Sequence, residues 1–207
     1  SCLVGSEMCI RDRICMLNGK GGVGRTTLAL NLASQLQCTY PSSSVFVADL
    51  DPQGSSLAWA RLAGEMAFTI GVSKSRATHD FIIYDTPPKL PENGVIHEAD
   101  VYLIPTLLDA VSYVVFLKTM ELVRRHELPH VIVANRFNPL RAEQRQRLAQ
   151  LTDNALIVRD RAIYASAYGE GKSVFDLAGK RAEQAQGDIN AISEALLAVA
   201  GQKGGGR

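Results

Sequence analysis

The sequence predicts a three-layer α/β sandwich with a mostly parallel central sheet. Short apolar runs alternate with longer amphipathic segments from Ile14 onward, which is the order expected of strand–helix–strand units. The short runs are apolar at nearly every position, which is typical of strands covered by helices on both faces. The chain has 207 residues, of which 46% are hydrophobic, enough for one domain with a sizeable core.

The first half of the chain supplies four of the expected strands. These apolar runs lie at 14–17, 44–48, 68–72 and 81–84. After the first run, Leu28, Leu32 and Leu36 recur at helical spacing and predict a helix over 26–37. A second helix is expected over 53–62, between the second and third strands.

The second half continues the alternation. Pro105 ends one apolar run and Pro129 precedes another, so three further strands are expected at 101–104, 131–134 and 155–157. Ile189, Ile192 and Leu196 share one face of the last helix. The helices of this half are expected at 109–125, 140–151 and 182–200.

The two ends differ from the 14–200 segment, which we expect to form a single domain. Residues 1–13, "SCLVGSEMCIRDR", show no period and resemble translated read-through from an adapter or vector. They do not resemble a signal peptide, because no apolar core follows a basic start. We therefore expect a disordered leader at 1–13 and a flexible tail at 201–207.

Charge and hydropathy exclude several classes of protein. The formal net charge is +1, so no overall field indicates a nucleic-acid partner. No apolar run approaches the roughly 18–20 residues that span a bilayer. A soluble, cytoplasmic protein is expected.

Polar motifs follow four of the expected strands directly. They lie at 19–27, 49–53, 85–88 and 135–136. In parallel sheets, ligands bind at the carboxyl ends of the strands, and these ends share one edge. The sequence therefore predicts a ligand site at that edge.

The first motif is a glycine-rich loop between a strand and a helix. Gly19 and Gly24-Arg25-Thr26 fit the pattern G-x-x-x-x-G-K-[ST] except at Arg25. In such a loop the backbone N–H groups and the following helix N-terminus converge on phosphate oxygens. The hydroxyl of Thr26 is placed to ligate Mg²⁺.

Several stretches together resemble the ParA/MinD family of ATPases, which has a P-loop NTPase fold. "GKGGVGRTT" is similar to the family's deviant Walker A loop, "ADLDPQGSSLAWA" to its second motif and "FIIYDTPP" to its Walker B strand. "ANRFNP" and "RAIYASAYGEGKSVFDL" also match small ParA proteins. The likeness covers about 14–200.

The resemblance implies roles at the matching positions. Lys20 would reach across an ATP-sandwiched dimer to the partner's phosphates, and Asp51 would orient the attacking water; these are the candidate catalytic residues. Thr26 would ligate Mg²⁺, with Asp49 and Asp85 acting through water. The nucleotide-binding set would be Gly19, Lys20, Gly21, Gly22, Val23, Gly24, Arg25, Thr26, Thr27 and Asn135, the last reading the adenine edge.

Four of these positions have plainer alternatives. Lys20 could be a solvated lysine, Asp49 and Asp51 could cap the following helix, and Asn135 could be an ordinary turn residue. Arg25 stands where the family has lysine. Arginine keeps the charge but is longer, planar and forked, so we expect nucleotide binding to survive and hydrolysis to be slowed. A single base change also converts lysine to arginine, so a sequencing error at this position is the other explanation.

The resemblance also implies partners. An ATP-sandwiched homodimer would bind DNA without sequence preference, associate with the nucleoid and release it when a centromere-binding activator protein stimulates hydrolysis. Residues 118–147 carry a net charge of +4 and could bind phosphates, although such a run is by default a solvated face.

The C-terminal "SEALLAVAGQKGGGR" lacks the bulky apolar residues of a membrane anchor. The expected function is plasmid or chromosome partition; the alternative is a nucleotide-binding adaptor, with weak or no hydrolysis, that positions a protein partner or conjugation machinery.

Overall fold

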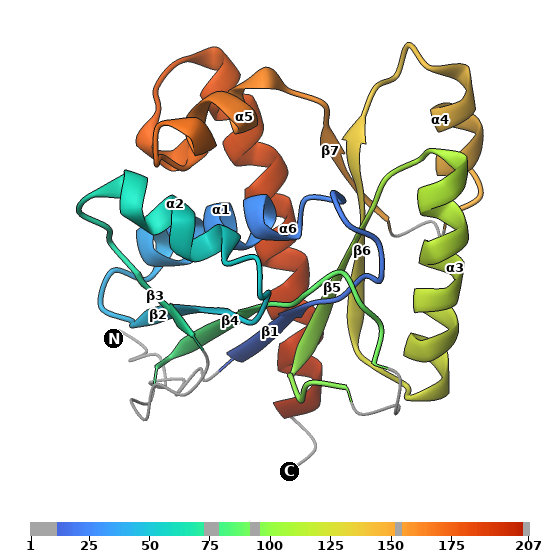
Figure 1. The fold of residues 1–207 in the computed structure, drawn as a ribbon, viewed down its shortest axis with the longest axis horizontal. Helices are drawn as coiled ribbons and strands as arrows, with labels where there is room; N and C mark the ends of the chain where they lie inside the picture. Colours follow the sequence, from blue (N-terminus) through green and yellow to red (C-terminus); the bar gives the residue numbers. More distant parts are fainter. Residues whose placement is uncertain (1–11, 73–78, 92–95, 152–154, 205–207) are drawn as a thin grey trace, which may run out of the picture.

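A seven-stranded parallel sheet forms the centre of the protein, in the order β3-β2-β4-β1-β5-β6-β7 (Figure 1). The computed structural model describes residues 12–72, 79–91, 96–151 and 155–204. The prediction of a three-layer α/β sandwich is confirmed. The strands are β1 (Asp12–Met16), β2 (Val45–Asp49), β3 (Thr69–Val72), β4 (Phe81–Asp85), β5 (Val101–Thr106), β6 (His130–Phe137) and β7 (Leu156–Arg159).

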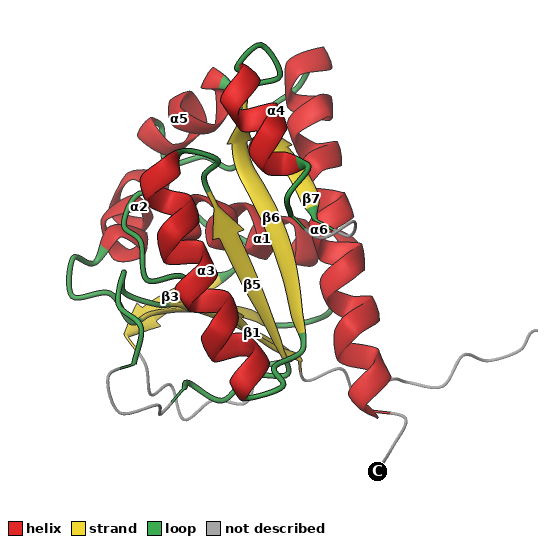
Figure 2. Ribbon diagram, turned by 90° about the vertical axis from the view of Figure 1, so that its right-hand side faces the viewer, coloured by secondary structure: helices red, strands yellow, loops and turns green. Residues whose placement is uncertain are grey.

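Helices cover both faces of this sheet (Figure 2). One face is covered by α1, α2, α5 and α6, whose side chains join the larger core cluster. The other face is covered by α3 and α4, which pack on the smaller core cluster. The bounds are α1 (Arg25–Thr39), α2 (Ser55–Ala63), α3 (Ala110–Arg125), α4 (Ala142–Leu148), α5 (Ala162–Gly169) and α6 (Lys180–Gly204), with a 3-10 turn η1 (Val174–Asp176).

The strand register brings the predicted polar motifs to one edge. Asp85 at the end of β4 pairs with Met16 at the end of β1 and with Asp49 at the end of β2. The glycine-rich loop follows Met16 closely along the chain. The carboxyl ends of these three strands therefore place the loop and both carboxylates side by side.

The structure differs from the sequence expectations at both ends. Asp12 and Arg13, expected in the leader, belong to β1, where they pair with Phe81 and Ile82. Ladder hydrogen bonds use the backbone, so polar side chains do not prevent this pairing. The last helix continues to Gly204, beyond the expected end at 200. Residues 1–11 and 205–207 lie outside the described part of the chain.

The interior differs at three places. Asn135 and Arg136, expected after a strand, lie inside β6, where the pairing with β7 shifts register between Ala134 and Phe137. The helix α5 and the turn η1 had no counterpart among the expected elements. The helix expected over 140–151 is the shorter α4. Within the described residues, no helix has both the length and the apolar character needed to cross a membrane.

Candidate functional site

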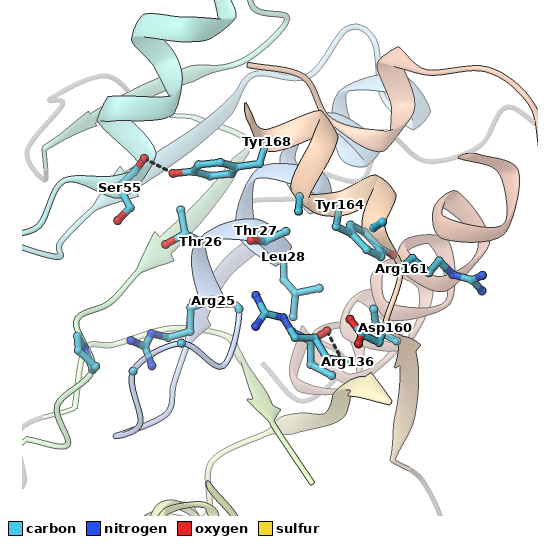
Figure 3. Close-up of a pocket in the computed structure, with 18 of the residues that line it drawn as sticks. Arg25, Thr26, Thr27, Leu28, Ser55, Arg136, Asp160, Arg161, Tyr164 and Tyr168 are labelled. Atoms are coloured by element: carbon cyan, nitrogen blue, oxygen red, sulfur yellow. Dashed lines mark hydrogen bonds between the residues drawn. The ribbon is translucent and has the colours of Figure 1, made fainter. Parts of the chain in front are cut away.

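A cavity of about 670 Å³ opens at the carboxyl edge of the sheet (Figure 3). The glycine-rich loop and the start of α1 form one wall, and the corner between β7 and α5 forms another. Eight of the residues predicted from the sequence line it: Gly21, Gly22, Gly24, Arg25, Thr26, Thr27, Asp51 and Asn135. The five others, Gly19, Lys20, Val23, Asp49 and Asp85, lie outside the lining.

The loop has a backbone that glycine makes possible. Gly22 and Gly24 have φ angles of 75° and 94°, in the left-handed region. Gly24 is also the N-cap of α1, so the free N–H groups of the first helical turn lie at the cavity wall. These N–H groups and the positive end of the helix dipole make the wall suited to an anion such as a phosphate.

Asn135 holds this loop from the neighbouring strand. Its Nδ2 donates to the carbonyl of Val23 at 2.7 Å, and its Oδ1 accepts from the backbone N–H of Arg136 at 2.9 Å. Arg136 has a φ of 53°, which is unusual for a residue with a side chain and coincides with the register shift in β6. Such irregularities re-aim side chains, and here both residues line the cavity.

Arg25 is buried in the loop at 7% exposure. Its Nη1 donates to the carbonyls of Asn18 and Lys20, both at 2.7 Å, and its Nε donates to the carbonyl of Thr86 at 2.9 Å. Burial lowers the pKa of the guanidinium, while the nearby carboxylates of Asp85 and Asp51 act in the opposite direction. The side chain that replaces the family's lysine thus bonds to three backbone carbonyls.

The aspartates after β2 occupy different environments. Asp49 is 4% exposed, and its two oxygens accept from the backbone N–H groups of Asp51 and Leu57. Leu57 lies in the first turn of α2, so Asp49 acts as a cap, as the plainer alternative expects. Asp51 lines the cavity, and its Oδ1 accepts from Gln53 N–H at 3.0 Å. The roles of both residues toward water and Mg²⁺ stay predictions.

Asp85 is a buried carboxylate behind the cavity wall, at 1% exposure. Its Oδ2 accepts from the hydroxyl of Ser56 at 2.7 Å. Burial raises the pKa of Asp85 above its ordinary value, although hydrogen bonds from Ser56 and Thr26 lower it in part. The connection to Thr26 places a carboxylate behind the one hydroxyl expected to ligate a metal.

These protein groups fit a magnesium ion that is held mainly by waters and by substrate phosphates, with few protein ligands. Among the described residues, no group of three or more His, Cys, Asp or Glu side chains could hold a metal alone. Mg²⁺ commonly keeps several waters and binds one or two protein groups together with substrate phosphates. Thr26 on the cavity wall, with Asp85 behind it, matches that arrangement.

Lys20 lies at the edge of this site. Its backbone N–H donates to Asn18 Oδ1 at 2.8 Å, and its carbonyl accepts from Arg25. Its side chain is half-buried and does not line the cavity. Gly19 lies nearby beneath Leu90, whose Cγ would be 2.9 Å from an added Cβ.

Sequence reasoning missed the opposite wall of the cavity. This wall comes from the β7–α5 corner and from α5, including Arg159, Asp160, Arg161, Tyr164 and Tyr168. The hydroxyl of Tyr168 donates to the carbonyl of Ser55 at 2.9 Å (Figure 3). Arg161 pairs with Asp188 of α6 at 3.1 Å. The signal was present, because Arg159 ends a strand at the same carboxyl edge as the predicted motifs.

Comparisons with known proteins identify the family and the fold of the chain. The model of the CobQ/CobB/MinD/ParA nucleotide-binding domain matches residues 14–174. The Maintenance of carboxysome distribution protein A of Gloeobacter kilaueensis is 29% identical over 206 residues, covering 88% of this chain and 93% of that protein.

Two solved structures share the fold over most of their length. An ATP complex of a variant of McdA from Cyanothece has a TM-score of 0.70 and 15% identity, covering 90% of this chain and 96% of that one. A Borrelia burgdorferi protein assigned to plasmid partition, bound to AMPPNP, has a TM-score of 0.67 and 17% identity, covering 93% and 99%.

Proposed function

Because the chain belongs to the CobQ/CobB/MinD/ParA nucleotide-binding family, we propose that it is an ATPase whose nucleotide cycle positions a cargo. ATP and Mg²⁺ bind in the cavity, two subunits close around the nucleotide, and the dimer binds DNA without sequence preference. An activating partner then stimulates hydrolysis and the dimer separates. The cycle works because the ATP state has a higher affinity for DNA than the ADP state.

One observation carries this proposal. The glycine-rich loop, the start of α1 and Asp51 line the same cavity, with Asp85 buried behind Thr26. Phosphates need the N–H groups and the helix start, and hydrolysis needs an acceptor near the terminal phosphate to hold a water in line. In this assignment Asp51 is that acceptor, and Thr26 ligates the metal.

The remaining residues receive roles by their positions. Mg²⁺ would neutralise charge on the phosphates, with Thr26 as its protein ligand and Asp49 and Asp85 acting through water. Asn135 would contact the base while it holds Val23. Lys20 would complete the site of a partner subunit, which makes hydrolysis depend on dimerisation.

The proposed binding partner of the dimer is DNA. Exposed basic side chains lie on or next to α3 and α4, interspersed with the exposed Glu121, Glu127 and Glu143: Lys118, Arg124, Arg125, Arg141 and Arg145. Basic side chains of this kind bind phosphate backbones without reading bases, and the affinity falls steeply with salt.

Two cargoes are supported by different relatives. Plasmid or chromosome DNA, delivered through a centromere-binding activator, fits the Borrelia burgdorferi protein that shares the fold. A protein assembly fits the relative from Gloeobacter kilaueensis, whose name assigns it to carboxysome distribution. The second candidate also fits the adaptor alternative, in which nucleotide state gates a protein partner.

Nucleotide-dependent dimerisation and DNA binding test the proposal. The molar mass is measured by light scattering with Mg-ATP, Mg-ADP or no nucleotide, and binding to two DNA duplexes of unrelated sequence is measured by fluorescence anisotropy. We expect a dimer with Mg-ATP alone and a gain in affinity of about tenfold for both duplexes. A molar mass and a DNA affinity that stay the same with Mg-ATP, with Mg-ADP and without nucleotide would refute the proposal.

A further inference from the structure

The guanidinium of Arg25 connects two loops that are distant in sequence. Nη1 bonds the phosphate loop at the carbonyls of Asn18 and Lys20, and Nε bonds Thr86, which follows β4. We define the Thr86 segment as residues 86–88. Arg25 is therefore part of the phosphate loop and of the tether that holds the Thr86 segment.

Residues of the Thr86 segment line two cavities. Pro88 lines the large cavity, while Thr86 and Pro87 line a second cavity of about 420 Å³. A shift of this segment would change the shape of the large cavity next to Arg25 and Asp51, which line it as well. The position of the segment is thus a property of the nucleotide site.

Within the part of the chain that the structure describes, two hydrogen bonds hold residues 86–88 to the rest of the protein. One is the bond from Arg25 Nε to the Thr86 carbonyl at 2.9 Å. The other is donated by the Thr86 hydroxyl to the carbonyl of Met16, the last residue of β1. Lys89, next along the chain, donates its backbone N–H to Pro87 at 2.8 Å and so closes a turn within the same region.

A lysine at position 25 could replace only part of this arrangement. One ammonium nitrogen can donate to the carbonyls of Asn18 and Lys20, because a single nitrogen, Nη1, serves both here. The bond to Thr86 comes from a different nitrogen of the planar fork, which lysine does not have.

We propose that Arg25 is a positioning residue, which fixes the Thr86 segment against the phosphate loop before nucleotide binds. Among the described residues, Nη2 makes no hydrogen bond and is left for a phosphate. Arginine at this position therefore adds a tether to the charge that a lysine would supply. The consequence for turnover rests on the proposed ATPase function, whereas the tether itself does not.

The test compares Arg25→Lys with the wild type in two measurements. Hydrogen exchange of the Lys89 and Leu90 amides in the nucleotide-free protein should become faster by about tenfold, since the segment loses the anchor that connects it to the phosphate loop. The dissociation constant for Mg-ATP should stay within about threefold, because the charge is kept. The tether reverses the expectation drawn from the sequence that arginine slows hydrolysis relative to lysine: kcat should fall by about tenfold in Arg25→Lys, because the geometry is lost.

Arg136→Lys is the matched control for exchange. Arg136 also lines the large cavity, and the described residues show no bond from it to the Thr86 segment. Its replacement should leave the exchange of Lys89 and Leu90 unchanged. Unchanged exchange in Arg25→Lys, or a faster rate in both variants, would overturn the proposal. Absence of turnover in the wild type would remove the ATPase assignment and leave the exchange result to decide on the tether.

A second variant decides the question if Arg25→Lys does not fold. Thr86→Val removes the hydroxyl that bonds Met16 and keeps the carbonyl that Arg25 holds. If Arg25 tethers the segment, the exchange of Lys89 and Leu90 should rise by less than about threefold in this variant. A rise of about tenfold or more would show that the hydroxyl, and not Arg25, is the principal anchor of the segment, which contradicts the proposed role.

Discussion

The side-chain amide of Asn135 lies directly against the backbone of Gly24. A Cβ added at Gly24 would come within 2.3 Å of Asn135 Nδ2, the same nitrogen that donates to Val23 at 2.7 Å. Gly24 thus serves two purposes, since its φ of 94° also disfavours a side chain. The phosphate loop and strand β6 meet at this contact.

A first prediction follows for the two glycines of the loop. Gly24→Ala should destabilise the protein by more than about 3 kcal/mol, because it combines a strained φ with a clash between the new Cβ and the side-chain amide of Asn135. Gly22→Ala is the control, since its φ is also positive but nothing lies within 4 Å of the added Cβ. It should cost only about 1–2 kcal/mol. Urea unfolding measures both, and equal losses would contradict the clash.

The second prediction concerns the amide of Asn135. Asn135→Asp replaces the donor to Val23 by an oxygen, and two acceptors then face each other in a site that is 6% exposed. We expect a loss of about 2–3 kcal/mol in the free energy of unfolding and weaker nucleotide binding. Asn138→Asp is the control, because Asn138 uses its Oδ1 to accept from Leu140 and an aspartate keeps that bond. If both variants were equally stable, the amide would not hold the loop.

The third prediction concerns pH and the buried carboxyl of Asp85. Its pKa is raised by burial from an ordinary value of 3.8, so the native state binds this proton more readily than the unfolded chain. The free energy of unfolding therefore falls as pH rises from about 3.8 through the raised pKa of Asp85. Above the raised pKa the full destabilisation by the buried charge is present. Asp85→Asn should be more stable than the wild type at pH 7, in EDTA without nucleotide, with a difference that shrinks toward pH 4.

Asp109 gives a control of opposite sign. Burial alone would raise its pKa, but hydrogen bonds from Ser112 at the start of α3 outweigh burial and lower it. Its contribution to stability is present above the ordinary value of 3.8 and is lost as pH falls through the lowered pKa. Asp109→Asn should therefore be less stable than the wild type at pH 7. Urea unfolding across pH measures both variants, and differences of the same sign would refute the assignment.

The fold could be predicted from the sequence because its signals are local. Apolar runs such as 44–48 and 81–84 mark buried strands, and the glycine-rich loop marks a strand-to-helix junction. The rule that parallel strands share a carboxyl edge then placed Asp49, Asp51 and Asp85 near the loop, as observed.

What the sequence could not show depends on pairing between distant segments. The register shift that carries Asn135 and Arg136 arises from how β6 meets β7, and no local pattern encodes it. The contacts of Arg25 with Thr86 and of Tyr168 with Ser55 join residues 61 and 113 positions apart. The capping of α2 by Asp49 was one of two alternatives, and only the three-dimensional arrangement separates a capping oxygen from one that faces the cavity.

Steady-state hydrolysis of ATP tests the central claim most directly. Turnover is measured with Mg²⁺ and non-specific DNA for the wild type and for Asp51→Ala, together with the dissociation constant of each for Mg-ATP. We expect saturable, Mg²⁺-dependent hydrolysis in the wild type and a loss of about 10²-fold or more in the variant, with nucleotide affinity within about threefold. Wild-type turnover no higher than that of Asp51→Ala would contradict the account.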